Sequence, residues 1–386
     1  MERATTRRRF LSGVAAGLGA SCWLGSLAGC GGEGSGVASS SGDGTLSNEG
    51  PIGPDGKPTP RKVELLLNWY PEAEHGGFFA AEALGFYREE NLDVTIVDGG
   101  PGKPVSPQVD QGRFAFGIEN ADRILVFRAR GADVVALFAP LHTSPRCILV
   151  HEESGITKLE DLANLTLAMN DDDPFAKFMR AKLPLPGVEV VAYTGGVKAF
   201  LARKDFAQQG YVFSEPILAR RGGAKPRVLL VSDLGFNPYT SVLIARTETT
   251  RRAAAVVKAM VRASSRGWLA YLKDPAPINA RIAARNPEMT EEFLAESAAA
   301  LRPFCDNPAT TDARRFGTMD PARWLELRDQ LASLGFFESS AVDPAAAVFD
   351  AFGSPPPNGS VSANGSGVSS SNRLEQRPLS SAWFKV

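Results

Sequence analysis

Residues 62–97 read KVELLLNWYPEAEHGGFFAAEALGFYREENLDVTIV, and this stretch decides the fold. The apolar run Val63 to Leu67 predicts a strand, Gly76 to Leu84 predicts a helix, and Leu92 to Val97 predicts a second strand. Strand, helix and strand at this spacing favour a parallel βαβ unit with its helix packed on the sheet. Asn68 and Trp69 follow the first strand directly, so we expect them at its carboxyl end.

The same alternation continues along the chain. Further helices are predicted at 105–111 and 121–130, with strands near 114–118, 134–139, 147–150, 165–169, 188–192, 210–213, 228–231 and 241–246. Helical patterns then fill 250–272, 275–285, 290–301, 320–334 and 344–352. We therefore expect an α/β protein of two lobes, each a parallel-rich sheet flanked by helices, with a helical C-terminal stretch.

Composition and predicted crossings at 140–146 and 235–240 divide the chain. The expected order is a signal at 1–29, a flexible tether at 30–60, lobe 1 at 61–140, lobe 2 at 141–236, a helical second part of lobe 1 at 237–353, and a low-complexity tail at 354–386. The tether and the tail are rich in Gly, Ser and Pro, and they carry too few large apolar residues to offset the entropy of ordering. Ligands of such open sheets bind beyond the carboxyl ends of the strands, here between the lobes.

The first thirty residues are typical of an export signal. Residues 6–11, TRRRFL, resemble the twin-arginine signal, and residues 27–30, LAGC, resemble the lipobox whose cysteine is acylated. The alternative is an ordinary cleaved signal in which Cys30 has no role. The paired motifs favour lipidation of Cys30 and a protein anchored to the outer face of the cytoplasmic membrane or within the periplasm.

Composition excludes several classes of function. The chain has 386 residues, 44% hydrophobic residues and a net charge of -1, so it lacks the basic surface that nucleic-acid binding requires. It has no nucleophile elbow, phosphate loop or metal-ligand spacing, so we assign no catalytic residue, metal or cofactor. Cys147 and Cys305 either pair or are two small buried side chains, and the second interpretation is favoured.

The motifs resemble those of a known superfamily. Residues 66–71, LLNWYP, are followed by HGGFFAA at 75–81, GFYREENLDV at 85–94, QGRFAFG at 111–117 and DFAQQGYVFSEP at 205–216. This order is similar to the solute-binding superfamily of sulfonate-, nitrate- and thiamine-pyrimidine-precursor-binding proteins, with a type II periplasmic-binding-protein fold. The resemblance implies a small-molecule ligand, an ABC permease and an ATPase as partners.

Asn68, Trp69 and His75 are most similar to the pyrimidine-precursor branch, whose eukaryotic members are synthases that consume a histidine and bound pyridoxal phosphate. The cysteine-rich run of those synthases is absent, because Leu234 to Tyr239 stands in its place. The resemblance therefore implies capture of an amine-bearing heterocycle by a protein that is not an enzyme. The alternatives are an exported enzyme distantly related to the synthases and a sulfonate or nitrate binder.

The predicted ligand site combines aromatic and acidic side chains. Trp69 is expected to stack on a flat ligand beside Asn68, with Tyr193 and Tyr239 as candidates for the opposite wall, although Trp69 could instead pack between lobes. Glu119, Asp172 and Glu215 follow predicted strands, which predicts an acidic site that favours amines over anions. For Asp172 and its neighbours, helix capping is the alternative. His75 is expected to face the ligand or to cap a helix, rather than to act as acid or base with Glu215.

Overall fold

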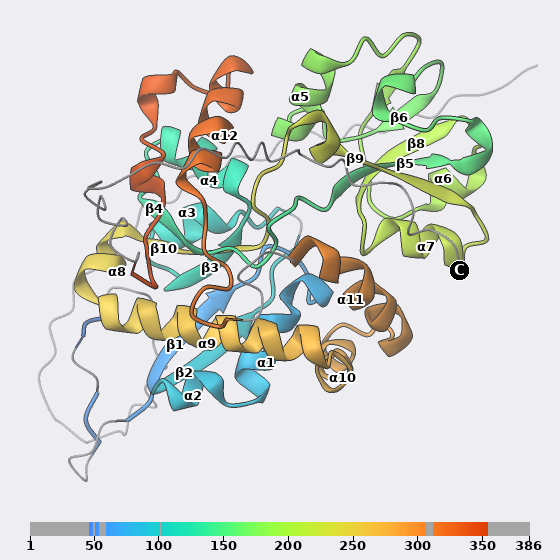
Figure 1. Cartoon of the computed structure of the whole chain (residues 1–386). Coiled ribbons are helices and arrows are strands. Elements are labelled where there is room, and N and C mark those ends of the chain that lie inside the picture. The colour runs from blue at the N-terminus through green and yellow to red at the C-terminus, as the bar shows by residue number, and fades with distance from the viewer. Residues whose placement is uncertain (1–45, 49–50, 54–58, 101, 306–311, 354–386) are drawn as a thin grey trace, which may run out of the picture. The chain divides into compact units, whose positions relative to one another are not determined.

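A computed structural model describes residues 46–48, 51–53, 59–100, 102–305 and 312–353 (Figure 1). The predicted signal at 1–29, Cys30 and the tail at 354–386 lie outside these residues. Part of the predicted tether packs on the fold, because Leu46 is buried and the Asn48 side chain accepts a hydrogen bond from the Ala255 backbone at 3.1 Å. Among the described helices, none has the length and apolar character needed to cross a membrane.

The strands form two sheets of five (Figure 1). The first has the order β2-β1-β3-β10-β4, and its strands are β1 Arg61–Leu66, β2 Leu92–Val97, β3 Phe116–Glu119, β4 Val134–Phe138 and β10 Val242–Arg246. The second has the order β7-β6-β8-β5-β9, and its strands are β5 Arg146–His151, β6 Thr166–Ala168, β7 Glu189–Val191, β8 Phe206–Tyr211 and β9 Pro226–Leu230. The predicted α/β class with two helix-flanked sheets is confirmed.

Both sheets are mixed, and in each of them one interior strand breaks the parallel pattern. β1 is parallel to β2 and β3, and β6 is parallel to β7 and β8. β10 is antiparallel to β3 and β4, and β5 is antiparallel to β8 and β9. β5 follows the crossing from the first sheet and β10 follows the return. Each therefore enters its sheet without the helical crossover that would turn it parallel to its neighbours.

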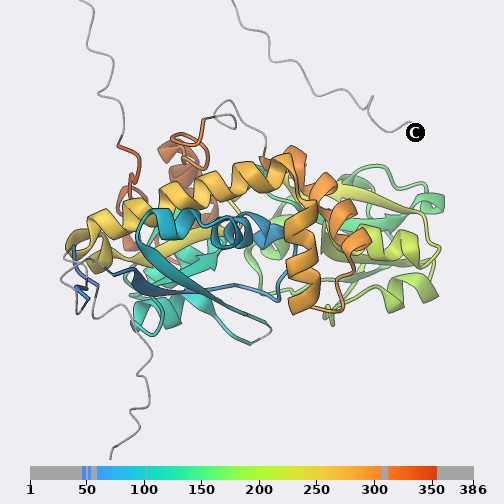
Figure 2. The same cartoon turned by 90° about the horizontal axis from the view of Figure 1, so that it is seen from below.

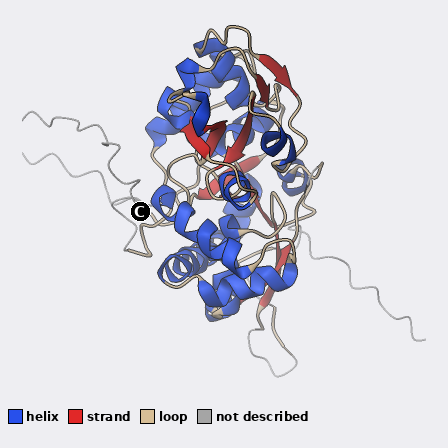
Figure 3. Cartoon of the chain, turned by 90° about the vertical axis from the view of Figure 1, so that its right-hand side faces the viewer, coloured by secondary structure: helices blue, strands red, loops and turns tan. Residues whose placement is uncertain are grey.

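Helices cover both faces of the first sheet and flank the second (Figure 3). The α-helices are α1 Gly76–Ala83, α2 Phe86–Glu89, α3 Val105–Asp110, α4 Ala121–Ala129, α5 Pro174–Lys182, α6 Lys198–Ala202, α7 Glu215–Arg221, α8 Thr247–Arg252, α9 Ala254–Lys273, α10 Ala276–Arg285, α11 Glu291–Cys305 and α12 Pro321–Ser333. Pro174 begins α5 directly after Asp173, at the helix position where a proline is best tolerated. Short 3-10 turns occur at Ala73–His75, Glu152–Ser154, Leu159–Asp161, Val231–Leu234, Ser339–Ala341 and Ala345–Ala347.

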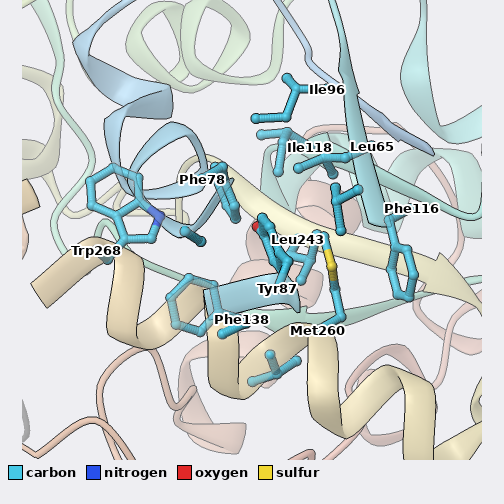
Figure 4. Packing of buried hydrophobic residues seen from close by; sticks show 14 of the residues in the cluster. Leu65, Phe78, Tyr87, Ile96, Phe116, Ile118, Phe138, Leu243, Met260 and Trp268 are labelled. Atoms are coloured by element: carbon cyan, nitrogen blue, oxygen red, sulfur yellow. The ribbon is translucent and has the colours of Figure 1, made fainter. Parts of the chain in front are cut away.

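The main core lies where α1 crosses the long helix α9 (Figures 2 and 4). Phe78 of α1 meets the Trp268 ring edge to face, with 5.8 Å between centroids. The two helices approach closely because glycines stand at the contact: a Cβ on Gly77 would lie 2.1 Å from the Trp268 ring, and one on Gly267 would lie 2.2 Å from the Gly77 carbonyl oxygen. The HGG run is therefore a requirement of helix packing.

A second cluster of buried side chains contains residues of both sheets. Ile244 of β10 and Leu125 of α4 belong to it together with Ile148 of β5, and Trp324 of α12 is one of its largest members. Cys147 and Cys305 are buried in two other clusters, and no disulfide joins them, which agrees with their interpretation as small buried side chains.

Several predicted boundaries differ from the structure. β8 spans Phe206–Tyr211 instead of 210–213, because its polar Gln208 and Gln209 are buried in the sheet and hid the strand pattern. The predicted helix at 250–272 is split at Ala253 into α8 and α9. Only the turn Ala345–Ala347 forms within 344–352, since Val348 instead bridges to Ala136 at the edge of β4.

The close approach of α1 and α9 leads to a first prediction. Gly77→Ala should lower the free energy of unfolding by about 1–3 kcal/mol, because the new methyl group must displace the fully buried Trp268. Chemical denaturation measures this loss. Gly222→Ala is the matched control, since the three atoms nearest its Cβ all belong to the exposed Leu201 side chain. Equal stability of the two variants would contradict this account of the crossing.

Candidate functional site

His75 joins the end of β1 to the start of α1. The imidazole is fully buried, and burial lowers its pKa to about 3, so the ring is neutral. Its Nε2 lies 2.8 Å from Asn68 Oδ1, and its Nδ1 lies 3.3 Å from the Glu72 backbone nitrogen. Since the backbone N–H must donate to Nδ1, the ring proton sits on Nε2 and is donated to Asn68. His75 thereby fixes the conformation of residues 68–75.

Three carboxylates gather beside this segment, and we refer to Glu72, Glu74 and Glu215 as the acid cluster. Glu72 and Glu74 are buried at 8% and 2% exposure. Burial, and then the charges of Glu74 and Glu215, raises the pKa of Glu72 well above its usual range. Burial also raises the pKa of Glu74 to about 7, against a lowering effect of the Ser241 hydroxyl, which donates to it at 3.1 Å.

Glu215 is contributed by the second sheet. It is the first residue of α7 and follows β8 by a short turn. The Tyr193 hydroxyl donates to its Oε1 at 2.8 Å, and the Tyr211 backbone N–H donates to its Oε2 at 2.7 Å. These two bonds fix the position of the carboxylate. Its charge contributes to the raised pKa values of Glu72 and Glu74, which shows that it lies close to both. The acid cluster therefore joins the two sheets.

Two aromatic side chains stand exposed beside the acid cluster. Trp69 and Tyr70 are 40% and 49% exposed, and their ring centroids are 5.5 Å apart in an edge-to-face arrangement. The Trp69 side chain also lies close enough to the Glu72 carboxyl group to lower its pKa, against the raising effect of burial. An exposed indole beside a buried acid is an arrangement that can stack on a flat ligand while the acid binds its polar groups.

Arg146, the first residue of β5, is a cation that acts on Glu74 and Glu215. Its guanidinium lies 4.2 Å from the ring centroid of Tyr211 and donates to the Tyr211 hydroxyl at 3.2 Å. Burial lowers its pKa, but Tyr211, Asp173 and Glu215 raise it by more, so the net shift is upward. One arginine is thus shared among several carboxylates, which leaves the surroundings of the acid cluster acidic.

A polar network crosses between the sheets next to Arg146. The Asn120 side chain donates to the Tyr211 hydroxyl at 3.1 Å and accepts from the Ser241 backbone N–H at 3.2 Å. Ser241 has a φ of 55°, a left-handed conformation that is costly for a residue other than glycine. Such strain is concentrated at functional sites. An ion pair between Arg123 of α4 and Asp173 adds a second link across the sheets.

The structure brings together five of the residues that the sequence predicts for the site: Asn68, Trp69, His75, Tyr193 and Glu215. Glu119 lies nearby but inward: its Oε1 accepts from the Asn120 N–H and its Oε2 accepts from the Ser106 hydroxyl, at 3.1 and 3.2 Å. Burial raises the pKa of Glu119 to about 7.

Asp172 and Tyr239 are not brought to the acid cluster. Asp172 is exposed between Asp171 and Asp173, and both of these neighbours form ion pairs. Tyr239 is 3% exposed, accepts a hydrogen bond from the Asp320 N–H at 2.8 Å and stacks against Trp324. These contacts give Tyr239 a packing position between the return crossing and α12.

Sequence reasoning missed Glu72, Glu74, Arg146 and Tyr211. Glu72 and Glu74 stand inside the NWYPEAEHGG run, between two segments that were singled out, and two acids in a segment with so many apolar neighbours were an available signal. Arg146 precedes an apolar strand and looks like an ordinary strand end. Its role depends on β8 and α5, which only the folded chain places beside it.

Two surface hollows lie away from the acid cluster. One, of about 270 Å³, follows the edge strand β2 between Tyr87 and Arg285. The other, of about 310 Å³, lies at the far ends of β5 and β6 near His151 and Lys204. Neither hollow is lined by a residue of the acid cluster. The side chains of the acid cluster, and not a hollow, therefore define the candidate site.

Known proteins resemble the chain in sequence and in fold. A family model described as NMT1/THI5 like matches residues 72–278. The formylaminopyrimidine-binding protein of Halalkalibacterium halodurans is 24% identical over 295 residues, covering 72% of this chain and 87% of that protein. The periplasmic aliphatic sulphonate binding protein of Escherichia coli has a TM-score of 0.58 and 14% identity, covering 85% of this chain and 100% of that structure.

A further relative is matched over a shorter stretch. The 4-amino-5-hydroxymethyl-2-methylpyrimidine phosphate synthase of Legionella pneumophila is 30% identical over 101 residues, which is 26% of this chain. The match spans only about a third (32%) of the synthase's own length. The likeness to the sulphonate binding protein, at its low identity, establishes the fold alone.

The raised pKa of Glu74 predicts a pH dependence of stability. Between about pH 4.5 and 7 the folded chain keeps a proton on Glu74 that the unfolded chain has lost, so Glu74 lowers the free energy of unfolding as pH rises. His75 acts in the opposite direction between about pH 3 and 6.5. Glu74→Gln isolates the glutamate: its stability relative to wild type should rise by on the order of 3 kcal/mol from pH 4.5 to 7.

Urea denaturation at several pH values measures this difference. Glu153→Gln is the control, since Glu153 is exposed and pairs with Lys204 far from the acid cluster. A stability difference between Glu74→Gln and wild type that stays constant across this pH range would show that Glu74 does not hold a proton in the folded chain.

Proposed function

We propose that this chain, which belongs to the NMT1/THI5-like family, captures a small amine-bearing heterocycle outside the cytoplasm and passes it to the permease and ATPase of an ABC importer. The observation that carries the proposal is the acid cluster beside the exposed rings of Trp69 and Tyr70. A thiamine pyrimidine precursor is a solute of this class.

The chemistry of the acid cluster selects for hydrogen-bond donors and positive charge. Burial raises the pKa values of Glu72 and Glu74, and repulsion from neighbouring carboxylates of the acid cluster raises them further. A protonated amine or an aminopyrimidine relieves this repulsion, because it donates to carboxylates and supplies the missing charge. The flat ring of such a solute can stack on Trp69 at the same time.

The relatives support this class of solute over an anion. The protein of Halalkalibacterium halodurans is named for binding formylaminopyrimidine, and its similarity extends over most of both chains. A sulfonate or nitrate would need free cationic donors at the site. Among the described residues, Arg146 is a cation beside the acid cluster, and it is already engaged with Tyr211 and surrounded by acids.

His75 favours a binding role over catalysis. Both of its ring nitrogens are engaged, and burial lowers the pKa of the ring to about 3, so it is a poor proton donor or acceptor near neutral pH. We infer that His75 positions Asn68 and Glu72 for the ligand, and that the chain is not an enzyme. Lobe 1 at 61–140 and 237–353 and lobe 2 at 141–236 are the two parts that we expect to enclose the solute.

Charge and stacking should contribute separately to binding. Glu215→Gln should weaken cationic 4-(aminomethyl)pyridine most and relieve repulsion of methanesulfonate, because it removes a charge and keeps the shape. Trp69→Ala should weaken binding of the flat 4-(aminomethyl)pyridine by about 1–3 kcal/mol and leave methanesulfonate little changed, because it removes a stacking surface. Calorimetric titration of both variants with both probes measures the two effects.

Glu153→Gln again serves as a control, because it removes an equal charge at an exposed position remote from the acid cluster. If Glu215→Gln leaves the ratio of the affinities for the amine and the sulfonate unchanged from wild type, the acidic site does not determine selectivity. A sulfonate would then be a candidate ligand again.

The proposed lipid anchor has its own test. Cys30→Ser should leave folding intact and release the protein from membranes, because a lipid rather than a spanning helix is expected to hold it. Fractionation of cells followed by a carbonate wash measures the release. Retention of Cys30→Ser in the washed membrane pellet would argue against lipidation.

A further inference from the structure

Asp122 carries a buried carboxylate oxygen without a partner. It lies in the first turn of α4 and is 8% exposed. Its Oδ1 is buried and has no hydrogen-bond partner among the described residues. Leaving such an acceptor unpaired is unfavourable, and more so for a charged group. A cost of this kind within a binding protein requires an explanation in terms of what the oxygen binds.

Neighbouring carboxylates differ from Asp122 in this respect. Both oxygens of Glu119 accept hydrogen bonds from Ser106 and Asn120. Both oxygens of Glu215 accept hydrogen bonds as well, from Tyr193 and Tyr211. Among these three acids, Asp122 is therefore the one with a buried oxygen that has no hydrogen-bond partner within the described residues.

The surroundings place Asp122 beside the acid cluster and not within it. Asp122 follows Asn120 by two residues, and the Asn120 side chain donates a hydrogen bond to the Tyr211 hydroxyl. The charged groups that act on Asp122 are Arg123 of its own helix, Asp173 at the start of α5 and Arg146 of β5. The backbone N–H of Tyr211 donates to Glu215, while its hydroxyl lies toward Asn120. Tyr211 thus spans from the acid cluster to the vicinity of Asp122.

We propose that Asp122 Oδ1 accepts a hydrogen bond from a second donor group of the captured solute. This inference rests on the proposed function and makes it narrower. The acid cluster takes one amine of the heterocycle, and Asp122 takes another on a separate arm. The solute class is then a ring with two separated donor groups, and Asp122 determines specificity for the second.

Two probes separate this role from general binding. 4-Aminopyrimidine carries one amine, and 4-amino-5-(aminomethyl)pyrimidine adds a second on a short arm. The full-length chain should bind the two-amine probe more tightly than 4-aminopyrimidine. Asp122→Asn should remove most of that preference, about a 10- to 100-fold change in relative affinity, because the uncharged amide oxygen accepts a weaker hydrogen bond than a carboxylate does. It should leave the affinity for 4-aminopyrimidine unchanged.

Glu119→Gln is the matched variant, a buried acid of similar position whose oxygens are already satisfied within the chain. It should keep the wild-type preference between the probes, whatever its effect on the melting temperature. Asp122→Asn should melt no lower than wild type, because no internal hydrogen bond of Oδ1 is lost.

The outcomes are distinguishable. Wild-type preference in Asp122→Asn overturns the inference alone, and so does an equal loss of both probes accompanied by a lower melting temperature, which would give Asp122 a structural role. Failure of the wild-type chain to bind either probe overturns the proposed function, and the inference falls with it.

Discussion

A neutral, fully buried imidazole determines the geometry of the candidate site. His75 accepts from the Glu72 backbone and donates to Asn68, so it closes the segment between β1 and α1 on itself. Every polar side chain that this segment presents, from Asn68 to Glu74, depends on that closure. The glycines that follow His75 let α1 pack against Trp268, so the same short run fixes both the core and the site.

Charge balance is the second constraint. The fold buries Glu72 beside Glu74, and Glu119 beside Asp122, while few cations among the described residues are buried. Burial of an ionised carboxylate is unfavourable unless it is paired, and here hydrogen bonds from Ser241, Tyr193 and backbone groups compensate in part. A positively charged solute would complete the compensation. The uncompensated acids thus lower the stability of the empty protein and raise its affinity for such a solute.

The sequence predicts the α/β class, the two groups of strands and half of the site, because these follow from local patterns. Apolar periodicity locates β1, α1 and β2, and a strand end marks where Asn68 and Trp69 lie. What could not be predicted depends on contacts between distant segments. Arg146 matters because Tyr211 lies beneath it, and Tyr239 is withdrawn because α12 offers it Trp324 and Asp320. The mixed sheets were also hidden, since strand direction depends on how the crossings enter each sheet.

The two antiparallel strands have a consequence for how the site can change. β5 and β10 both start at the crossings, and Arg146 begins one while Ser241 immediately precedes the other. Arg146 and Ser241 therefore belong to, or directly border, two interior strands of the sheets. A substitution at either position disturbs the sheet together with the site. Trp69 and Tyr70 are exposed and lie outside any strand. Substitutions at these two aromatic positions can change ligand selectivity without disturbing a sheet, whereas substitutions at Arg146 or Ser241 cannot.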